Sequence, residues 1–110
     1  MVYKLRFVQS YDKRHEDAFW HWEHKFMELE KKTPELKVGK RYVPVMGKEP
    51  TNTLIWEAEY ESLEEAVRVL EILENNREHD ELLEHQLPYM RDAYVELYRL
   101  DEGVINSEKA

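Results

Sequence analysis

Five histidines are the side chains of this sequence best suited to chemistry near neutral pH, because imidazole titrates there. His21 and His24 stand about one helical turn apart, a spacing at which two imidazoles could share a metal ion. On a helical wheel both point away from the apolar stripe of their segment, and no third ligand lies nearby in the sequence. We therefore expect a solvated pair and no bound metal.

His79 is the best single candidate for a catalytic group. It falls on the inward side of a short predicted helix, together with Leu82, Leu83 and Gln86. An imidazole in that position either donates to a carbonyl as a structural group or faces a pocket as an acid or base. We take the structural role as the simpler interpretation and keep the pocket role open. For His15, close to a strand end, we also expect a structural role.

Aromatic side chains are numerous for a chain of 110 residues. Such a set usually forms core and interface. A helix and a sheet that carry several of them could also leave a cleft for a flat or apolar ligand. The candidate ligand-binding residues are Trp22, Phe26, Tyr42, Trp56 and His79.

Charged side chains alternate with apolar ones along the predicted strands. Lys4, Arg6, Glu57 and Glu96 all fall on the phase opposite to the apolar set, so both signs of charge should share one face of a sheet. One interpretation is a set of cross-strand ion pairs that fix register at a dimer contact. The other is an anion site or polar-ligand site built on Arg6 and Arg41.

Four strands must position these side chains. Their signals are period-two alternation and runs of β-branched and aromatic residues, with Gly and Pro between the two central runs. Pro44 near the end of the second run predicts an edge strand. The predicted strands are Val2–Gln9, Val38–Met46, Thr53–Tyr60 and Ala93–Leu100.

The first helix should begin near an N-cap at Asp12 and end before Pro34. Its spacing of four, four and three residues predicts a single apolar stripe. That stripe consists of Ala18, Trp22, Phe26 and Leu29.

Ser62 and Glu65 form a capping box that predicts the start of the second helix. A third, short helix is predicted over 78–87, before Pro88. The predicted apolar stripe of the second helix is Leu63, Ala66, Val67, Leu70 and Leu73.

This order of elements predicts an α+β, ferredoxin-like βαββαβ fold with a four-stranded antiparallel sheet and the helices on one face. The other face of such a sheet is bare and apolar, and the expected partner is a second copy. We therefore expect a homodimer that forms a dimeric α+β barrel. The domain should span residues 1–100, followed by a polar tail over 101–110.

Composition excludes several classes of function. The formal net charge is -8, with no basic stripe, so neither nucleic acid nor a membrane surface is an expected partner. The absence of cysteine removes thiolate catalysis and sulfur-ligated metals, and no cofactor is implied. No apolar run approaches the ~20 residues of a membrane span. The expected location is the cytoplasm.

Several motifs are similar to those of the NIPSNAP family, within the dimeric α+β barrel superfamily. They cover the chain from residue 2 to about 100, and the strand-to-helix run is the most specific. These motifs are Val2–Arg6, Trp56–Ala66, Leu87-Pro88 and Tyr94–Arg99. The resemblance implies the same fold and a homodimer.

The chain departs from its relatives at two positions. Members of this pattern tend to carry Trp where His79 stands. Trp22 and Pro34 also resemble the ether-degradation branch of the superfamily, in which a histidine is typical at the position of Phe26. That departure argues against carrying over a catalytic histidine.

Three functions remain open at this stage. The first is a NIPSNAP-like binding protein that holds a small apolar or aromatic molecule between sheet and helices. The second is a cofactor-independent monooxygenase or a cyclase- or isomerase-type enzyme, as in other branches. The third is a purely structural homodimeric interaction module. Ligand and reaction are not specified by the sequence.

Overall fold

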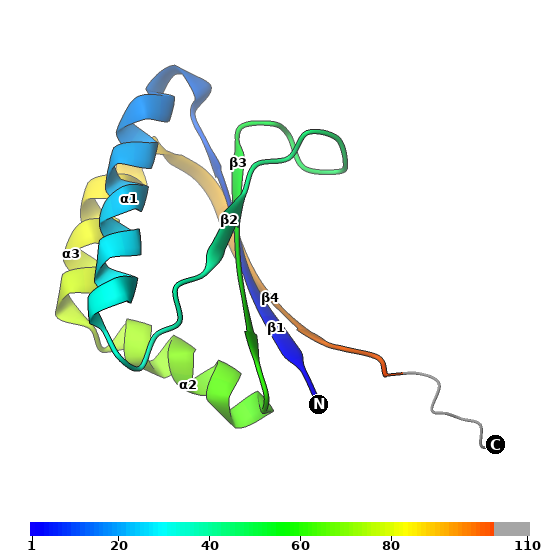
Figure 1. Ribbon diagram of the computed structural model, residues 1–110. Coiled ribbons are helices and arrows are strands. Elements are labelled where there is room, and N and C mark those ends of the chain that lie inside the picture. Colours follow the sequence, from blue (N-terminus) through cyan, green and yellow to red (C-terminus); the bar gives the residue numbers. More distant parts are fainter. Residues whose placement is uncertain (103–110) are drawn as a thin grey trace.

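The computed structural model describes residues 1–102 and has the predicted order of strands and helices (Figure 1). From residue 103 onward, the predicted tail lies outside the described residues. The strands are β1 (Tyr3–Tyr11), β2 (Lys40–Tyr42), β3 (Thr53–Tyr60) and β4 (Met90–Arg99). The helices are η1 (Lys13–His15), α1 (Glu16–Lys32), α2 (Leu63–Glu74), α3 (Arg77–Gln86) and η2 (Leu87–Tyr89).

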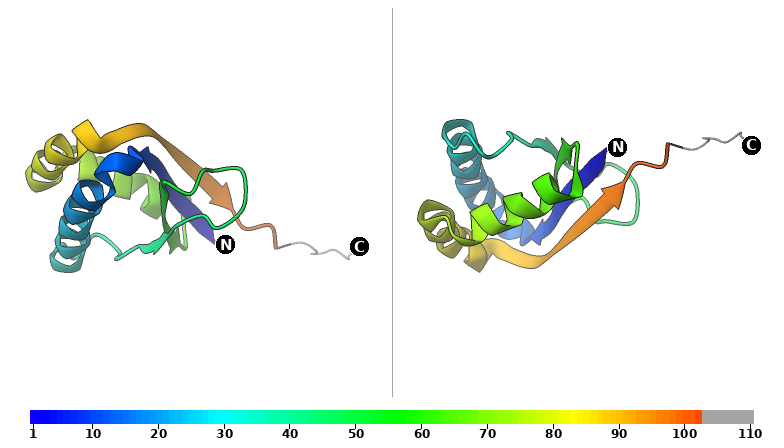
Figure 2. Two further views of the ribbon diagram at one scale, coloured as in Figure 1. Left: turned by 90° about the horizontal axis from the view of Figure 1, so that it is seen from above. Right: turned by 90° about the horizontal axis from the view of Figure 1, so that it is seen from below.

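The four strands form one sheet in the order β2-β3-β1-β4, and every pairing is antiparallel. The three α-helices lie on one side of this sheet, with α1 and α3 side by side (Figure 2). The predicted α+β, ferredoxin-like class is therefore confirmed. In the register, Arg6 stands between Glu57 on β3 and Glu96 on β4.

The second strand is shorter than predicted. β2 covers Lys40–Tyr42 instead of Val38–Met46, although it is an edge strand as Pro44 indicated. The following loop lies on the side of the sheet away from the helices (Figure 1). The hydroxyl of Tyr94 on β4 donates to Glu49, which ties this loop to the sheet instead of letting it extend the hairpin.

The apolar stripe of α1 is rotated from the predicted one. Its buried residues are Phe19, Glu23, Phe26 and Leu29, whereas Trp22 is partly exposed. Phe19 stacks on Tyr11 with ring centroids 4.5 Å apart, because β1 extends two residues beyond its predicted end and brings that ring over the helix start. The prediction of Ala18 and Trp22 as core positions was wrong.

Side chains cap the two later helices. Ser62 Oγ accepts from the backbone N–H of Glu65 at 3.1 Å, as the capping box predicted. The Glu65 carboxylate accepts from Glu61 N rather than from Ser62 N. α2 turns Ala66 and Val69 inward and leaves its predicted stripe positions Leu63 and Val67 exposed. α3 begins one residue early, at Arg77, after an Asn76 cap.

The rotated stripe makes a stability prediction. Phe19→Ala should lower the free energy of unfolding by about 3–5 kcal/mol, since it removes a fully buried ring and leaves a cavity. Trp22→Ala should cost only about 1–2 kcal/mol, because its indole is partly exposed and loses mainly a stack on His85. Urea unfolding of both variants measures this. A larger loss for Trp22→Ala would contradict the rotated phase.

Candidate functional site

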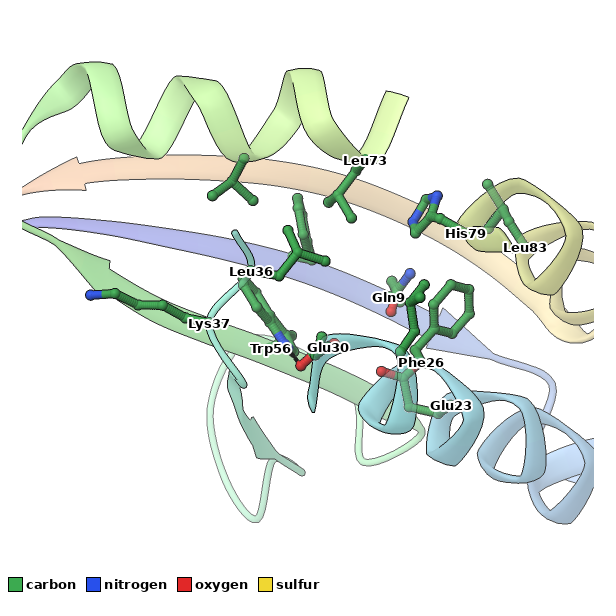
Figure 3. Close-up of a pocket in the computed structure, with 13 residues that line it drawn as sticks. Gln9, Glu23, Phe26, Glu30, Leu36, Lys37, Trp56, Leu73, His79 and Leu83 are labelled. Atoms are coloured by element: carbon green, nitrogen blue, oxygen red, sulfur yellow. Dashed lines mark hydrogen bonds between the residues drawn. The ribbon is translucent and has the colours of Figure 1, made fainter. Parts of the chain in front are cut away.

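A cavity lies between the helix-facing side of the sheet and the three α-helices (Figure 3). The cavity has a volume of about 70 Å³ and opens to solvent. Most of the surface is apolar. The lining residues are Phe7, Gln9, Glu23, Phe26, Leu29, Glu30, Leu36, Lys37, Trp56, Val69, Leu73, His79 and Leu83.

Three of the five predicted ligand-binding residues line this cavity: Phe26, Trp56 and His79. They come from α1, β3 and α3, far apart in the sequence. Trp22 lies outside the lining, stacked on His85 with ring centroids 4.3 Å apart. Tyr42 is also outside it, on the edge strand and 47% exposed.

A buried ionic cluster of Arg41, Glu23 and Glu30 stands beside the cavity. Arg41 Nε donates to Glu23 Oε2 at 2.9 Å, and Arg41 Nη2 donates to Glu30 Oε2 at 2.6 Å. The three side chains are 7%, 5% and 12% exposed, in that order. Because buried charges are costly unless they are paired and hydrogen-bonded, this arrangement fixes β2 against α1.

Trp56 and Gly39 complete the cluster from the sheet side. The indole Nε1 of Trp56 donates to Glu30 Oε1 at 3.2 Å, and the backbone N–H of Gly39 donates to the same oxygen at 3.0 Å. A Cβ atom on Gly39 would lie 2.0 Å from the Trp56 ring. Only glycine therefore permits this close approach.

Glu23 is an acid of the cavity wall whose pKa is perturbed by its surroundings. Burial raises the pKa of its carboxyl group above the ordinary 4.5, against the opposing effects of Arg41 and of Gln86. Gln86 Nε2 donates to Glu23 Oε1 at 2.9 Å. A carboxyl group with a raised pKa at a cavity wall is a candidate acid or base.

His79 faces the cavity from α3, and its ring packs against Phe26 with centroids 5.2 Å apart. Burial lowers the pKa of the imidazole below its ordinary 6.5, which favours the neutral form of the side chain. Asp80 Oδ1 is 3.7 Å from Nδ1, beyond hydrogen-bond distance, and offsets only part of this effect. The expected inward direction of His79 is confirmed.

Cross-strand ion pairs occupy the opposite face of the sheet. Arg6 Nε is 2.9 Å from Glu57 Oε2, Arg6 Nη1 is 3.3 Å from Glu96 Oε1, and Lys4 Nζ is 3.4 Å from Glu57 Oε1. Arg41 turns instead toward the helices, as its partner Trp56 does. The predicted cross-strand ion pairs are confirmed, and a joint anion site of Arg6 and Arg41 was wrong because they lie on opposite faces.

The histidine pair on α1 forms no site of its own. His21 and His24 are exposed, as the helical wheel indicated. Within residues 1–102, no group of three or more His, Cys, Asp or Glu side chains could hold a metal ion. In the same part of the chain, no helix is long and apolar enough to cross a membrane.

Sequence reasoning missed four polar residues of the cavity: Gln9, Glu23, Glu30 and Lys37. A signal for the two acids was available, because Glu23 and Glu30 share one helical stripe with Phe19 and Phe26. The predicted stripe was instead the one that contains Trp22, because Trp22 is a large apolar side chain. Gln9 had no signal beyond its alternation with Val8.

Comparisons with known proteins define the fold. No family model and no curated protein matches the sequence. A NIPSNAP family protein from Agrobacterium tumefaciens aligns over 94% of this chain and 96% of its own, with 10% identity and a TM-score of 0.75. An uncharacterised NIPSNAP-like domain protein from Burkholderia xenovorans aligns over 93% and 87%, with 17% identity and a TM-score of 0.72.

A third similar structure is that of a protein named after an enzyme activity. This Nitrosomonas europaea protein, described as a candidate antibiotic biosynthesis monooxygenase, aligns over 93% of this chain and 92% of its own, with 11% identity and a TM-score of 0.67. At such identities the likeness establishes the fold and no activity. The chain thus has the NIPSNAP-like α+β fold that its motifs implied.

The raised pKa of Glu23 predicts a particular pH dependence. Folded protein holds this proton more tightly than the unfolded chain does, so the Glu23 contribution to stability falls as pH rises from about 4.5 and levels off above the raised folded pKa. The Glu23→Gln variant should lack this decrease in stability with rising pH. Urea titrations of wild type and variant across this range measure the difference.

The exposed Glu28, on the same helix, provides the control. Glu28→Gln removes one negative charge and should leave the pH profile of wild type unchanged. A wild type that gains stability relative to Glu23→Gln as pH rises would contradict the assignment.

Proposed function

We propose that the protein binds a small apolar or aromatic molecule in the cavity between sheet and helices. The observation that carries this proposal is a largely apolar cavity, open to solvent and lined by a few polar groups, which is the usual character of ligand pockets. The cavity volume of about 70 Å³ is smaller than the ~150 Å³ that accommodates benzene. A bound ring would therefore extend into the open mouth.

An enzymatic role is the second candidate. Glu23 and His79 line one cavity, and burial shifts the pKa of the acid up and the pKa of the base down. Titratable groups whose pKa values are displaced within one pocket are typical of acid–base sites. This supports a cofactor-independent monooxygenase or a cyclase- or isomerase-type reaction, with Glu23 joining His79 as a candidate group.

A homodimer is the proposed assembly. The sheet face without helices carries apolar and aromatic side chains, among them Ile55, Tyr94 and Tyr98. Its ion pairs combine both signs of charge, so the surface is complementary to a second copy of itself. The 1–100 domain would then form half of a dimeric α+β barrel. A cytoplasmic location stays a prediction from the sequence.

Ligand binding is tested by thermal denaturation with a panel of apolar and aromatic compounds. A ligand at 100 times its dissociation constant should stabilise the wild type by about 2.7 kcal/mol. His79→Trp should abolish the shift, because the larger ring fills the cavity. Glu84→Trp, exposed on the same helix, should retain it. If no compound shifts the wild type, the structural interaction module becomes the better account.

The homodimer is tested by sedimentation. Ile55→Lys should raise the dimer dissociation constant more than tenfold, or about 1.4 kcal/mol, since it places an unpaired ammonium in the proposed interface. Val67→Lys, on the exposed side of α2, makes the same chemical change away from that face and should have little effect. A wild type that remains monomeric at micromolar concentration would contradict the assembly.

A further inference from the structure

Two polar side chains of the cavity make no hydrogen bond to the described part of the protein. Within residues 1–102, neither the side-chain amide of Gln9 nor either ring nitrogen of His79 makes a hydrogen bond, although Asp80 Oδ1 lies 3.7 Å from the buried Nδ1 of His79. Gln9 comes from β1 and His79 from α3, and Figure 3 shows both at the same end of the cavity as Phe26. Polar groups that converge without a partner in an apolar pocket are suited to fixing a ligand.

The other polar groups of the lining are already occupied. Each oxygen of Glu23 accepts one hydrogen bond, from Gln86 and from Arg41. Both oxygens of Glu30 accept from Arg41, and one of them also accepts from Trp56. These groups maintain the wall, and the free hydrogen-bonding capacity lies with Gln9 and His79.

The charged side chains of the cavity wall disfavour binding of an anionic ligand. Glu23 and Glu30 are two carboxylates with a single guanidinium, that of Arg41, between them. Lys37 adds its aliphatic stem to the lining, but its ammonium group donates to the carbonyl of Glu59, away from the cavity (Figure 3). A carboxylate ligand would therefore meet net negative charge in a poorly hydrated site.

The apolar side chains that make up the rest of the cavity lining are suited to contact an apolar ring of a ligand. Phe26 packs against His79 itself, and Leu83 lies beside it on the same helix. Phe7 stacks on Trp56 with centroids 5.0 Å apart and continues the apolar surface toward the other end. A ligand with an apolar ring would contact these side chains while its polar group reaches the free nitrogens.

We propose that the cavity binds a small neutral molecule with an apolar ring and one hydroxyl group, the hydroxyl lying between His79 and Gln9. This inference rests on the proposed ligand-binding function and narrows its ligand class. The hydroxyl donates to an unprotonated imidazole nitrogen and accepts from the amide N–H of Gln9. Phenol is the simplest probe with this chemistry.

The test compares four probes that share one benzene ring by calorimetric titration at pH 7: phenol, toluene, benzoate and benzylamine. Wild type should bind phenol about tenfold more tightly than each of the others, the difference expected for a satisfied hydrogen-bonding pair. His79→Phe and Gln9→Leu should each weaken phenol binding about fivefold or more and leave toluene binding unchanged. His85→Phe, on the outer side of α3, should change neither.

Each other outcome has a defined meaning. Equal affinity for phenol and toluene in wild type would overturn this inference and leave the proposed apolar site intact. Tighter binding of benzoate or benzylamine would overturn the neutral-ligand assignment. Binding of no probe would overturn the proposed function as well. If His79→Phe fails to fold by circular dichroism, Gln9→Leu and the wild-type comparison decide the matter.

Discussion

The pairing of Arg41 with Glu23 and Glu30 is the constraint on which the rest of the site depends. It joins the short edge strand β2 to α1, and through Glu30 it reaches the indole of Trp56 on β3. Loss of the guanidinium would leave two carboxylates buried without a counter-charge, a change that typically costs about 3–5 kcal/mol. The cavity wall is thus held by electrostatics, although the cavity surface is mostly apolar.

The strands could be predicted because their pattern is local. Alternation with period two placed Arg6 and Glu57 on one face, and the antiparallel order then brought them together. The extent of β2 could not be predicted, because it depends on distant contacts. Glu23 and Glu30 anchor Arg41 at one place, and the bond from Tyr94 to Glu49 draws the following loop across the sheet.

The residues of the candidate site could be predicted only in part, because some of them depend on contacts between segments that are distant in the sequence. Phe26, Trp56 and His79 could be named because large or titratable side chains on inward phases are readily recognised in a sequence. Glu23 could not be named from the sequence. A buried carboxylate is expected only where partners are known, and the hydrogen bonds from Arg41 and Gln86 to Glu23 are seen only in the structure. Two helical phases of α1 were compatible with the sequence, and the partners of Glu23 favour the one that buries it.

The strand order has a consequence for the growing chain. β1 is an inner strand of the sheet, flanked by β3 and by β4, so one of its edges stays unpaired until β4 has been synthesised. Until β4 leaves the ribosome, β1 has one unpaired edge, with its backbone N–H and C=O groups open to other strands. Complete pairing of β1 therefore depends on β4, and premature termination before residue 90 would release a chain prone to aggregate.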